Sequence, residues 1–422
     1  MAQSKWSESD LTQSQSVFYG SGVNGFLPAR GPARVLAAAQ LANSLGDGAY
    51  LVCSALYFTR IVGLSATQIG LGLTLGWAVG SIAGIPLGHL ADRRGPRGTA
   101  VLLALATAVA VGSFLVVRTY VPFVIAVCLY ASCQSGLAAA RQALLAALVD
   151  KAKRTEVRAY LQSTVNAGLA VGAAVGGLAL QADTREAYLT VFALDALGFV
   201  AAAVVLHGLP AVPPAPAVAG EPALTVLRDR PYALVTLLNT VMLLYMPLLS
   251  LVVPLWIVQR TEAPRWTVAA LLVLNTLGVV LFQVRVARRV TGLASATRFV
   301  RYAGIALLAS CATFALSAGG TAWTAGLALL VAAALQLLGE VLLASGAWQI
   351  GFDLAPADKQ GQYQGFFGSG VPVARMVGPL LLTALVIGWG TAGWLLLGAL
   401  FLAAGLATGP AVRWAARSRS LV

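Results

Sequence analysis

The sequence predicts an all-α membrane protein in which twelve transmembrane helices form two pseudo-symmetric bundles of six. Apolar residues make up 59% of the 422 residues and charged residues only 10%, whereas roughly one quarter of a soluble domain is charged. Apolar runs of about 20 residues, each long enough to cross a bilayer as a helix, recur along nearly the whole chain. A proline-rich segment at 208–224 separates the first six runs from the last six. Duplicated six-helix halves recur among membrane proteins.

The individual spans follow from cutting the apolar runs at charged or turn-forming residues. The spans of the first half lie at 34–59, 67–90, 99–117, 121–148, 159–180 and 187–206. Those of the second half lie at 232–257, 266–284, 299–318, 322–350, 362–387 and 390–412. Pro247 and Pro254 interrupt the amide ladder of the seventh span, which is therefore expected to bend.

These spans divide the chain into five parts. The parts are a polar tail at 1–32, a six-helix bundle at 33–206, a linker at 207–231, a second bundle at 232–412 and a basic tail at 413–422. The first part lacks the apolar stretch and cleavage site of a secretory signal, so it is expected to be a polar tail. The linker has weak hydrophobic patterning and many prolines, which is typical of a connecting segment.

The distribution of the 28 Lys and Arg residues predicts the orientation of the chain. Twelve spans place both termini on one side, and only five of these residues lie in loops of the other side: Arg60, Arg118, Arg185, Arg260 and Arg265. Arg375 lies inside a span, and all the others lie on the side of the termini. Because Lys and Arg concentrate in cytoplasmic loops, both termini are expected in the cytoplasm. The formal charge of +13 therefore reflects topology, and no nucleic-acid partner is expected.

One loop between the second and third spans reads GHLADRRGPRG, residues 88–98. Its Gly88, Leu90, Ala91, Asp92, Arg93 and Gly95 match the G-x-L-a-D-r-x-G-r loop of the major facilitator superfamily, and Arg97 lies one position after the last arginine of that pattern. With the span count and the two halves, the chain resembles this family over about residues 33–412. The resemblance implies a multi-pass plasma-membrane transporter, not an enzyme, whose first, fourth, seventh and tenth helices line a central cavity.

The fifth span is similar to the G-x-x-x-G-P-x-x-G-G motif of bacterial drug/proton antiporters in this superfamily. Gly168, Gly172, Gly176 and Gly177 fit the motif, while Ala173 replaces its proline. The resemblance favours proton-coupled export of a small, drug-like or metabolite-like molecule, with a proton-coupled uptake symporter as the alternative. A sensor or scaffold without transport, or a membrane enzyme, is a remote alternative, since no nucleophile elbow or phosphate-binding loop is present.

The loop at 88–98 is predicted to act as a conformational latch formed by Gly88, Asp92, Arg93, Gly95 and Arg97. Glycines at 72, 76, 80, 84 and 88 form a row that ends in this loop, and such rows let a second helix come close. Asp92 is expected to meet the start of the eleventh span near Gly361, because a helix start presents unpaired amides. The arginines are expected to hold carbonyls, acids or lipid headgroups, or else only to fix the topology.

The glycine rows of the second, fifth and eleventh spans are expected to lie where the two halves meet, either as sliding surfaces or as static close packing. The row of the fifth span is Gly168, Gly172 and Gly176. A weak repeat of the basic loop at 284–292 supports a duplication of the halves.

Ionisable residues at bilayer depth are costly and mark functional sites. The proton-coupling candidates are Asp47, Glu340, Arg375 and Arg141. A buried carboxylate beside a mobile arginine can alternate between proton-bound and ion-paired states, because burial favours its neutral form and a nearby cation its charged form. A permanent structural ion pair is the alternative. Asp195 lies in the sixth span, which the resemblance places at the periphery, so a structural role is expected there.

Polar and aromatic residues on the first, fourth, seventh and tenth spans are candidates for a substrate cavity, although each could instead pack or lie at the interface. They are Asn43, Tyr50, Tyr130, Asn239, Tyr245, Gln336 and Trp348. The four cysteines lack metal-like spacing and are expected to pack as small apolar residues. The expected partners are a small-molecule substrate, protons and membrane lipid. We expect a monomer with no metal or cofactor, driven by the proton gradient.

Overall fold

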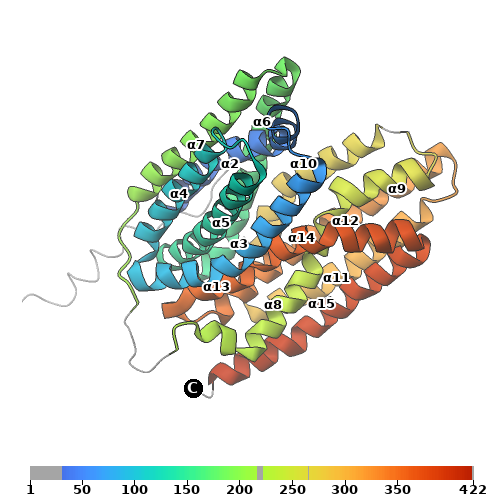
Figure 1. Ribbon diagram of the computed structural model, residues 1–422. Coiled ribbons are helices and arrows are strands. Elements are labelled where there is room, and N and C mark those ends of the chain that lie inside the picture. Colours follow the sequence, from blue (N-terminus) through green and yellow to red (C-terminus); the bar gives the residue numbers. More distant parts are fainter. Residues whose placement is uncertain (1–30, 216–221, 265, 421–422) are drawn as a thin grey trace, which may run out of the picture.

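The computed structural model describes residues 31–215, 222–264 and 266–420 of the chain, and within these its regular secondary structure is entirely helical. The predicted tail at 1–32 lies almost wholly outside the described residues, as do residues 216–221 of the linker. The helices form two bundles, one from the first half of the chain and one from the second (Figure 1). The predicted twelve-helix fold is confirmed.

Six spans build the N-terminal half. They are α2 (Pro32–Leu56) with a π-helical turn (Tyr57–Ile61), α3 (Ala66–Arg94), α4 (Pro96–Ser113), α5 (Tyr120–Leu148), α6 (Arg154–Ala182) after a 3-10 turn (Lys151–Lys153), and α7 (Arg185–His207). Local sequence explains their limits. The Ser65 side chain accepts from the Gln68 amide and caps the start of α3. Gly95 has a φ of 89° and is followed by Pro96 at the first position of α4, so the chain turns sharply there.

Six spans also build the C-terminal half. They are α8 (Arg230–Met242) with α9 (Val253–Arg260), α10 (Thr267–Ala287), α11 (Leu293–Leu316), α12 (Ala322–Leu354), α13 (Gln360–Gly368) with α14 (Gly370–Leu382) and a π-helical segment (Thr383–Gly388), and α15 (Thr391–Ser420). Within the described part of the chain, eleven spans have the length and apolar composition to cross a membrane. The first span, α2, carries several polar residues and completes the twelve.

The seventh and eleventh spans are interrupted, and the twelfth is longer than the sequence predicts. The seventh is irregular between α8 and α9, with Pro247 preceding a π-helical turn at Leu248–Val252, close to where its prolines predict a bend. The eleventh breaks at Ser369 between α13 and α14, which the sequence analysis did not anticipate. The helix α15 continues to Ser420, so residues assigned to a basic tail from 413 extend the last helix, because no helix-breaking residue follows Pro410 before Ser420.

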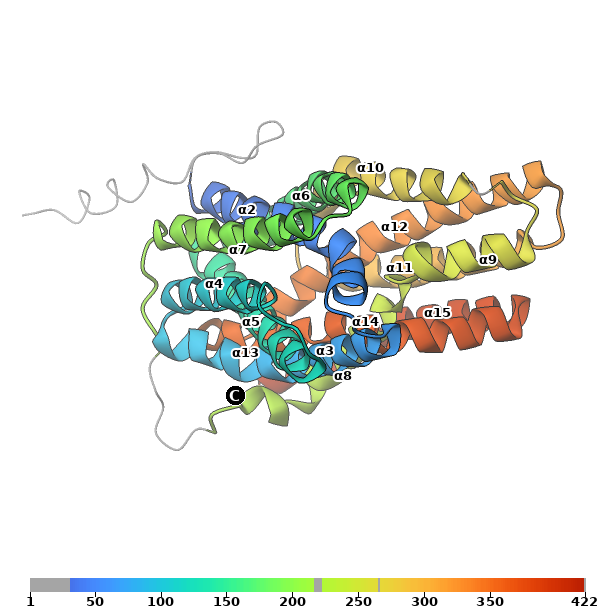
Figure 2. The same cartoon turned by 45° about the horizontal axis from the view of Figure 1, so that its top comes forward.

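We call the basic end that end of the bundle where α3 and α10 finish and where α6 and α13 begin. The two halves meet there: α13 packs against α3 and α5, and α6 packs against α10 and α12. The helices α3 and α13 lie side by side in both views (Figures 1 and 2).

The glycine rows of the second and fifth spans lie largely inside the N-terminal half, contrary to the expectation that they line the contact between the halves. Gly361 and Gly365 of the eleventh span do meet α3 of the other half, as expected. Methyl groups at Gly168, Gly172 and Gly176 would overlap α2 of the same half, at or near Ser44, Leu45 and Ala49. Gly72, Gly76 and Gly80 of α3 likewise face α5. Only the last two, Gly84 and Gly88, reach the other half, at Gly365 and Gly361 of α13. Close helix contacts within each half therefore account for most of the glycine spacing.

Candidate functional site

A polar network surrounds the carboxylate of Asp47 in the middle of α2. Its Oδ2 accepts from Asn43 Nδ2 at 3.0 Å, and its Oδ1 accepts from the Tyr130 hydroxyl at 3.1 Å and from Gln134 Nε2 at 3.2 Å. The Gln134 amide also donates to the Tyr130 hydroxyl at 3.1 Å. Three donors on one carboxylate stabilise its charged form.

Arg141 joins this network from the basic end of α5. Its Nη2 donates to Asn43 Oδ1 at 2.9 Å, and its Nη1 donates to Gln40 Oε1 at 2.9 Å. The side chain is 8% exposed. Because Asn43 donates to Asp47 and accepts from Arg141, it links the carboxylate to the guanidinium without a direct ion pair. A change at Asp47 therefore reaches Arg141 through one amide side chain.

Glu340 of α12 forms a second, smaller polar group in the C-terminal half. Its Oε2 accepts from Asn275 Nδ2 of α10 at 2.8 Å, and the Tyr245 hydroxyl lies beside its carboxylate. Each half therefore carries a mid-span carboxylate that is held by amide and tyrosine side chains. Glu340 and Arg375 form no salt bridge in the described part of the chain.

Arg375 lies between the halves. It belongs to α14, yet its guanidinium lies over the Trp77 ring of α3, 5.9 Å from the ring centroid. Tyr130 and Asp47 of one half and Tyr245 of the other act on its charge. The residue is exposed although it lies mid-span and is surrounded by residues of both halves. It therefore borders open space between the halves rather than their packed interiors.

Other predicted cavity residues lie in packed surroundings. Tyr50 is buried among aromatic rings, with centroids of Tyr130 and Phe192 each 5.6 Å away. Trp348 of α12 lies under the Arg158 guanidinium of α6 at 5.0 Å, at the contact between the halves. Gln336 is 1% exposed. Of the predicted set, Asn43 and Tyr130 join Asp47, and Tyr245 joins Glu340.

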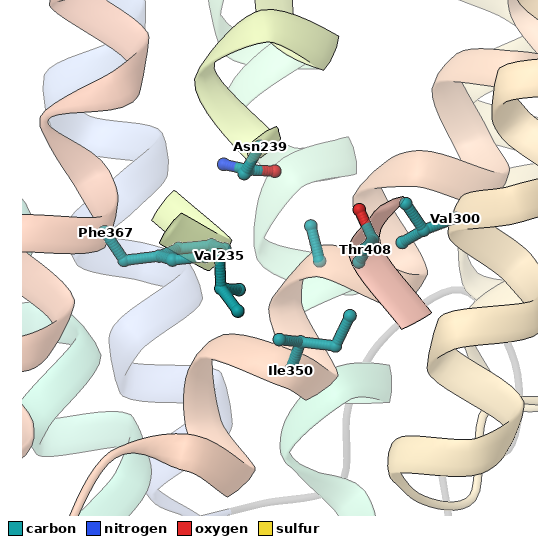
Figure 3. A pocket seen from close by; sticks show the side chains of 7 residues that line it. Val235, Asn239, Val300, Ile350, Phe367 and Thr408 are labelled. Carbon is teal, nitrogen blue, oxygen red and sulfur yellow. The ribbon is translucent and has the colours of Figure 1, made fainter. Parts of the chain in front are cut away.

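Asn239 faces a small cavity inside the C-terminal half, of water size (Figure 3). The other residues around it are Val235, Val300, Ala347, Ile350, Phe367 and Thr408. They come from α8, α11, α12, α13 and α15, so the cavity is separate from the space between the halves. Because it is so small and mostly apolar, it does not fit the predicted role of Asn239 in a substrate cavity in this state.

The loop at 88–98 fastens the two halves at the basic end. Asp92 Oδ1 accepts from the Gly361 amide at 2.6 Å and Oδ2 from the Gln362 amide at 2.9 Å. These are the first amides of α13, where a carboxylate is stabilised by the helix dipole. Gly88 permits this contact, because a methyl group there would overlap the Gly361 carbonyl.

The rest of the loop holds the chain that follows α7. Arg97 Nη1 donates to the Leu209 carbonyl at 2.9 Å, and the Ala215 amide donates to the Asp92 carbonyl at 2.8 Å. A side chain at Gly95 would press on the Val212 carbonyl. Arg93, within the loop at 88–98, is half-buried. The first part of the linker therefore packs on the predicted latch, a contact that the sequence analysis missed.

Ion pairs join the halves on the other side of the basic end. Arg288 Nε lies 2.7 Å from Glu156 Oε1, which links the end of α10 to the start of α6. Lys151 Nζ lies 3.5 Å from Asp353 Oδ1, and Thr155 donates to Gln349. Exposed pairs of this kind contribute little individually, but all of them close the same end of the molecule.

Comparison with known proteins identifies the family of the chain. The sequence profile described as Major Facilitator Superfamily matches residues 36–368. The chain belongs to the major facilitator superfamily. Members of this superfamily are membrane transporters and not enzymes. No curated protein matches the chain.

Solved structures show the same superfamily fold at low sequence identity. The chain is similar to the human organic anion transporter MFSD10 (TM-score 0.69, 16% identity, 89% of this chain and 98% of that one). It is similar to a bacterial homologue of the iron transporter ferroportin in an outward-facing state (0.73, 14%, 91% and 99%). It is also similar to a variant of the E. coli fucose:proton symporter FucP (0.66, 14%, 91% and 98%).

Three residues of the site were not predicted from the sequence. Gln134 lies four residues after Tyr130, so helical spacing alone could have placed it on the same face. Asn275 is a lone amide in the eighth span, and its partner Glu340 became clear only from the packing of α10 on α12. Trp77 gave no signal, because an aromatic residue in a span is usually a packing residue.

The structure adds no metal site to this superfamily chain. Within residues 31–215, 222–264 and 266–420, no three side chains of His, Cys, Asp or Glu gather as a set of metal ligands. The four cysteines are free thiols, and Cys53 donates to the Gly176 carbonyl at 3.3 Å. The polar groups of the site are carboxylates, amides, tyrosines and arginines, whose chemistry is hydrogen bonding and proton transfer.

Proposed function

We propose that the protein exports small, partly apolar organic molecules in exchange for protons, by alternating access of a site between its two halves. The Asp47 network carries this proposal. Three donors favour the charged form of this mid-span carboxylate, while its depth in the membrane disfavours that form, and protonation removes the attraction that holds those donors. Asp47 can therefore gain and lose a proton with a structural consequence.

The consequence spreads through Asn43 to Arg141 and thus along α2 and α5. When Asp47 is charged, Asn43 is oriented between carboxylate and guanidinium. When Asp47 is neutral, that orientation loses its electrostatic basis. Proton binding is thereby coupled to the contact between two helices of the N-terminal half, as coupled transport requires.

Competition for the oxygens of Asp47 favours exchange over cotransport. A substrate whose polar group hydrogen-bonds to Asp47 takes the place that a proton would occupy. Binding of one ligand then weakens binding of the other, since both act on the same carboxylate. The aromatic rings of Trp77 and Tyr130 lie nearby, and their apolar surfaces suit a partly apolar substrate.

We propose that the protein lies in the plasma membrane. Its basic end and both termini face the cytoplasm, because Lys and Arg are in excess at that end. The latch and the inter-half ion pairs lie at this end, while Arg375 is exposed at mid-span. These observations support an outward-facing state in which the site is reached from outside the cell.

Purified protein in proteoliposomes with an imposed pH gradient tests the proposal. A panel of aromatic cations, organic anions and neutral amphiphiles is offered, and proton movement is followed with an entrapped pH-sensitive dye. We expect at least one compound to move against the direction of proton flow, and Asp47→Asn to uncouple it. Movement in the same direction as protons would instead establish the symporter alternative, and no movement of any panel member would contradict transport of this class.

A further inference from the structure

Asp195 is a buried carboxylate that the proposed mechanism does not yet use. It lies in the middle of α7 and is 0% exposed. Neither of its carboxylate oxygens has a hydrogen-bond partner in the described part of the chain. α7 packs against α2, and a methyl group at Gly46 would overlap Asp195 Oδ1. The carboxyl group therefore lies directly on the residue that precedes Asp47.

An ionised carboxylate in these surroundings is strongly disfavoured. Burial of a charge without donors costs far more than burial of the neutral acid, so such a group takes up a proton. Asp47, one residue along α2 from the contact, has three donors. The two carboxyls therefore differ: three donors favour the negative charge of Asp47, whereas Asp195 has no such donor in the described part of the chain. Paired acids with such different surroundings take different roles in proton transfer.

The groups that face Asp195 can be named from each element that packs on α7. Asp47 and Tyr50 belong to α2, which packs on α7, and Tyr130 belongs to α5; the three act on one another and on Asp195. The other titratable residues on elements packed against α7 lie nearer the ends of those elements: Arg34, Cys53, Tyr57, Arg60, Arg97, Arg154, Glu156, Arg158 and Tyr160. No cation therefore neutralises a charge on Asp195 at its own depth among the described residues.

We propose that Asp195 is a second proton-carrying carboxyl of the N-terminal half, which holds a proton while Asp47 is charged. This inference rests on the proposed proton exchange. With Asp47 charged, the pair therefore holds one proton, at Asp195, and one negative charge, at Asp47. When Asp47 takes up a proton, an O–H bond forms there and the pair holds two protons and no charge. Release of that proton breaks the bond and restores the first state.

Infrared spectroscopy of the reconstituted protein tests this without a transported substrate. The carbonyl stretch of a neutral carboxylic acid is followed from about pH 5 to about pH 10, a range that spans ordinary and strongly perturbed carboxyl groups. We expect a neutral-acid band at neutral pH that Asp195→Asn removes and that disappears within this range in the wild type. In Asp47→Asn, the band remains but its midpoint moves, because the neighbouring charge is gone.

Asp183→Asn is the matched control, since Asp183 is a half-exposed aspartate whose ion pair with Arg60 lies at the other end. It should leave the band unchanged. If Asp195→Asn does not fold, the fallback is the Asp47→Asn variant labelled with 13C-aspartate. The label must shift the neutral-acid band of that variant, which assigns the band to an aspartate. An Asp195→Asn spectrum identical to that of the wild type overturns the proposal, as does a band that neither pH nor Asp47→Asn affects. These outcomes leave the transport test of the proposed function untouched.

Discussion

Replacing Asp92 with asparagine should open the basic end of the molecule. The Asp92 carboxylate accepts two amide hydrogen bonds, of 2.6 and 2.9 Å, from the start of α13. A hydrogen bond to a charged group contributes about 1.5–3 kcal/mol. Asparagine retains one oxygen acceptor and presents an NH2 group to the other amide, so about one charged bond is lost. The resulting ~2 kcal/mol corresponds to a roughly 30-fold fall in the ratio of closed to open molecules.

Distance measurements between spin labels report this ratio directly. Ala152 and Ala357 are exposed residues on opposite halves at the basic end, and each can carry a label once the native cysteines are replaced. The distance distribution between the labels should gain a longer component in Asp92→Asn. Transport should fall in the same variant, because the state that is closed at the basic end and open at the opposite end is less populated.

The control is Asp183→Asn, which removes an ion pair within the N-terminal half at the opposite end. It should leave the label distances at the basic end unchanged. If Asp92→Asn gives the same distance distribution and the same transport as the wild type, the two hydrogen bonds do not hold the halves together and the latch interpretation is wrong.

Three further substitutions address the latch and the coupling network. Gly88→Ala should lengthen the same label distance, because its methyl group overlaps the Gly361 carbonyl and overpacking costs about 1–3 kcal/mol. Asp47→Asn should abolish the dependence of transport on an imposed pH gradient while the protein stays monodisperse on size exclusion. Arg141→Lys should lower transport about tenfold, a loss of ~1.4 kcal/mol, since one ammonium group cannot bridge two amide oxygens as the guanidinium does; transport equal to the wild type would remove Arg141 from the network.

The latch shows how far the sequence can lead. Asp92 is a lone acid in a basic loop, and its neighbour Gly88 ends a row of glycines. A carboxylate beside a glycine at a helix end suits the amides of another helix start. The sequence therefore predicts both partners, Asp92 and Gly361. It does not predict that residues 208–215 cover the loop, because a proline-rich segment shows no pattern that places it.

The glycine rows and Asp195 show where sequence reasoning ends. A row of glycines predicts a close helix contact but does not identify the partner helix, so the row of α6 was assigned to the contact between halves and in fact faces α2. The burial of Asp195 depends on Gly46, which lies on a helix 149 positions away in the sequence. The sequence without its packing cannot distinguish an acid on the periphery from one that lies against the residue before Asp47.

The latch and the site between the halves belong to the same two spans. α3 carries Asp92 at its end and Trp77 near its middle, while the eleventh span begins at the amides held by Asp92 and carries Arg375 beyond its break at Ser369. Separation of the spans at the basic end must alter the distance between Arg375 and Trp77, unless the break at Ser369 absorbs the motion. The break therefore decides whether the latch and the site move together. Ser369→Ala, which deletes the hydroxyl bond to the Phe366 carbonyl, should weaken the effect of Asp92→Asn on transport if the break is where the span bends.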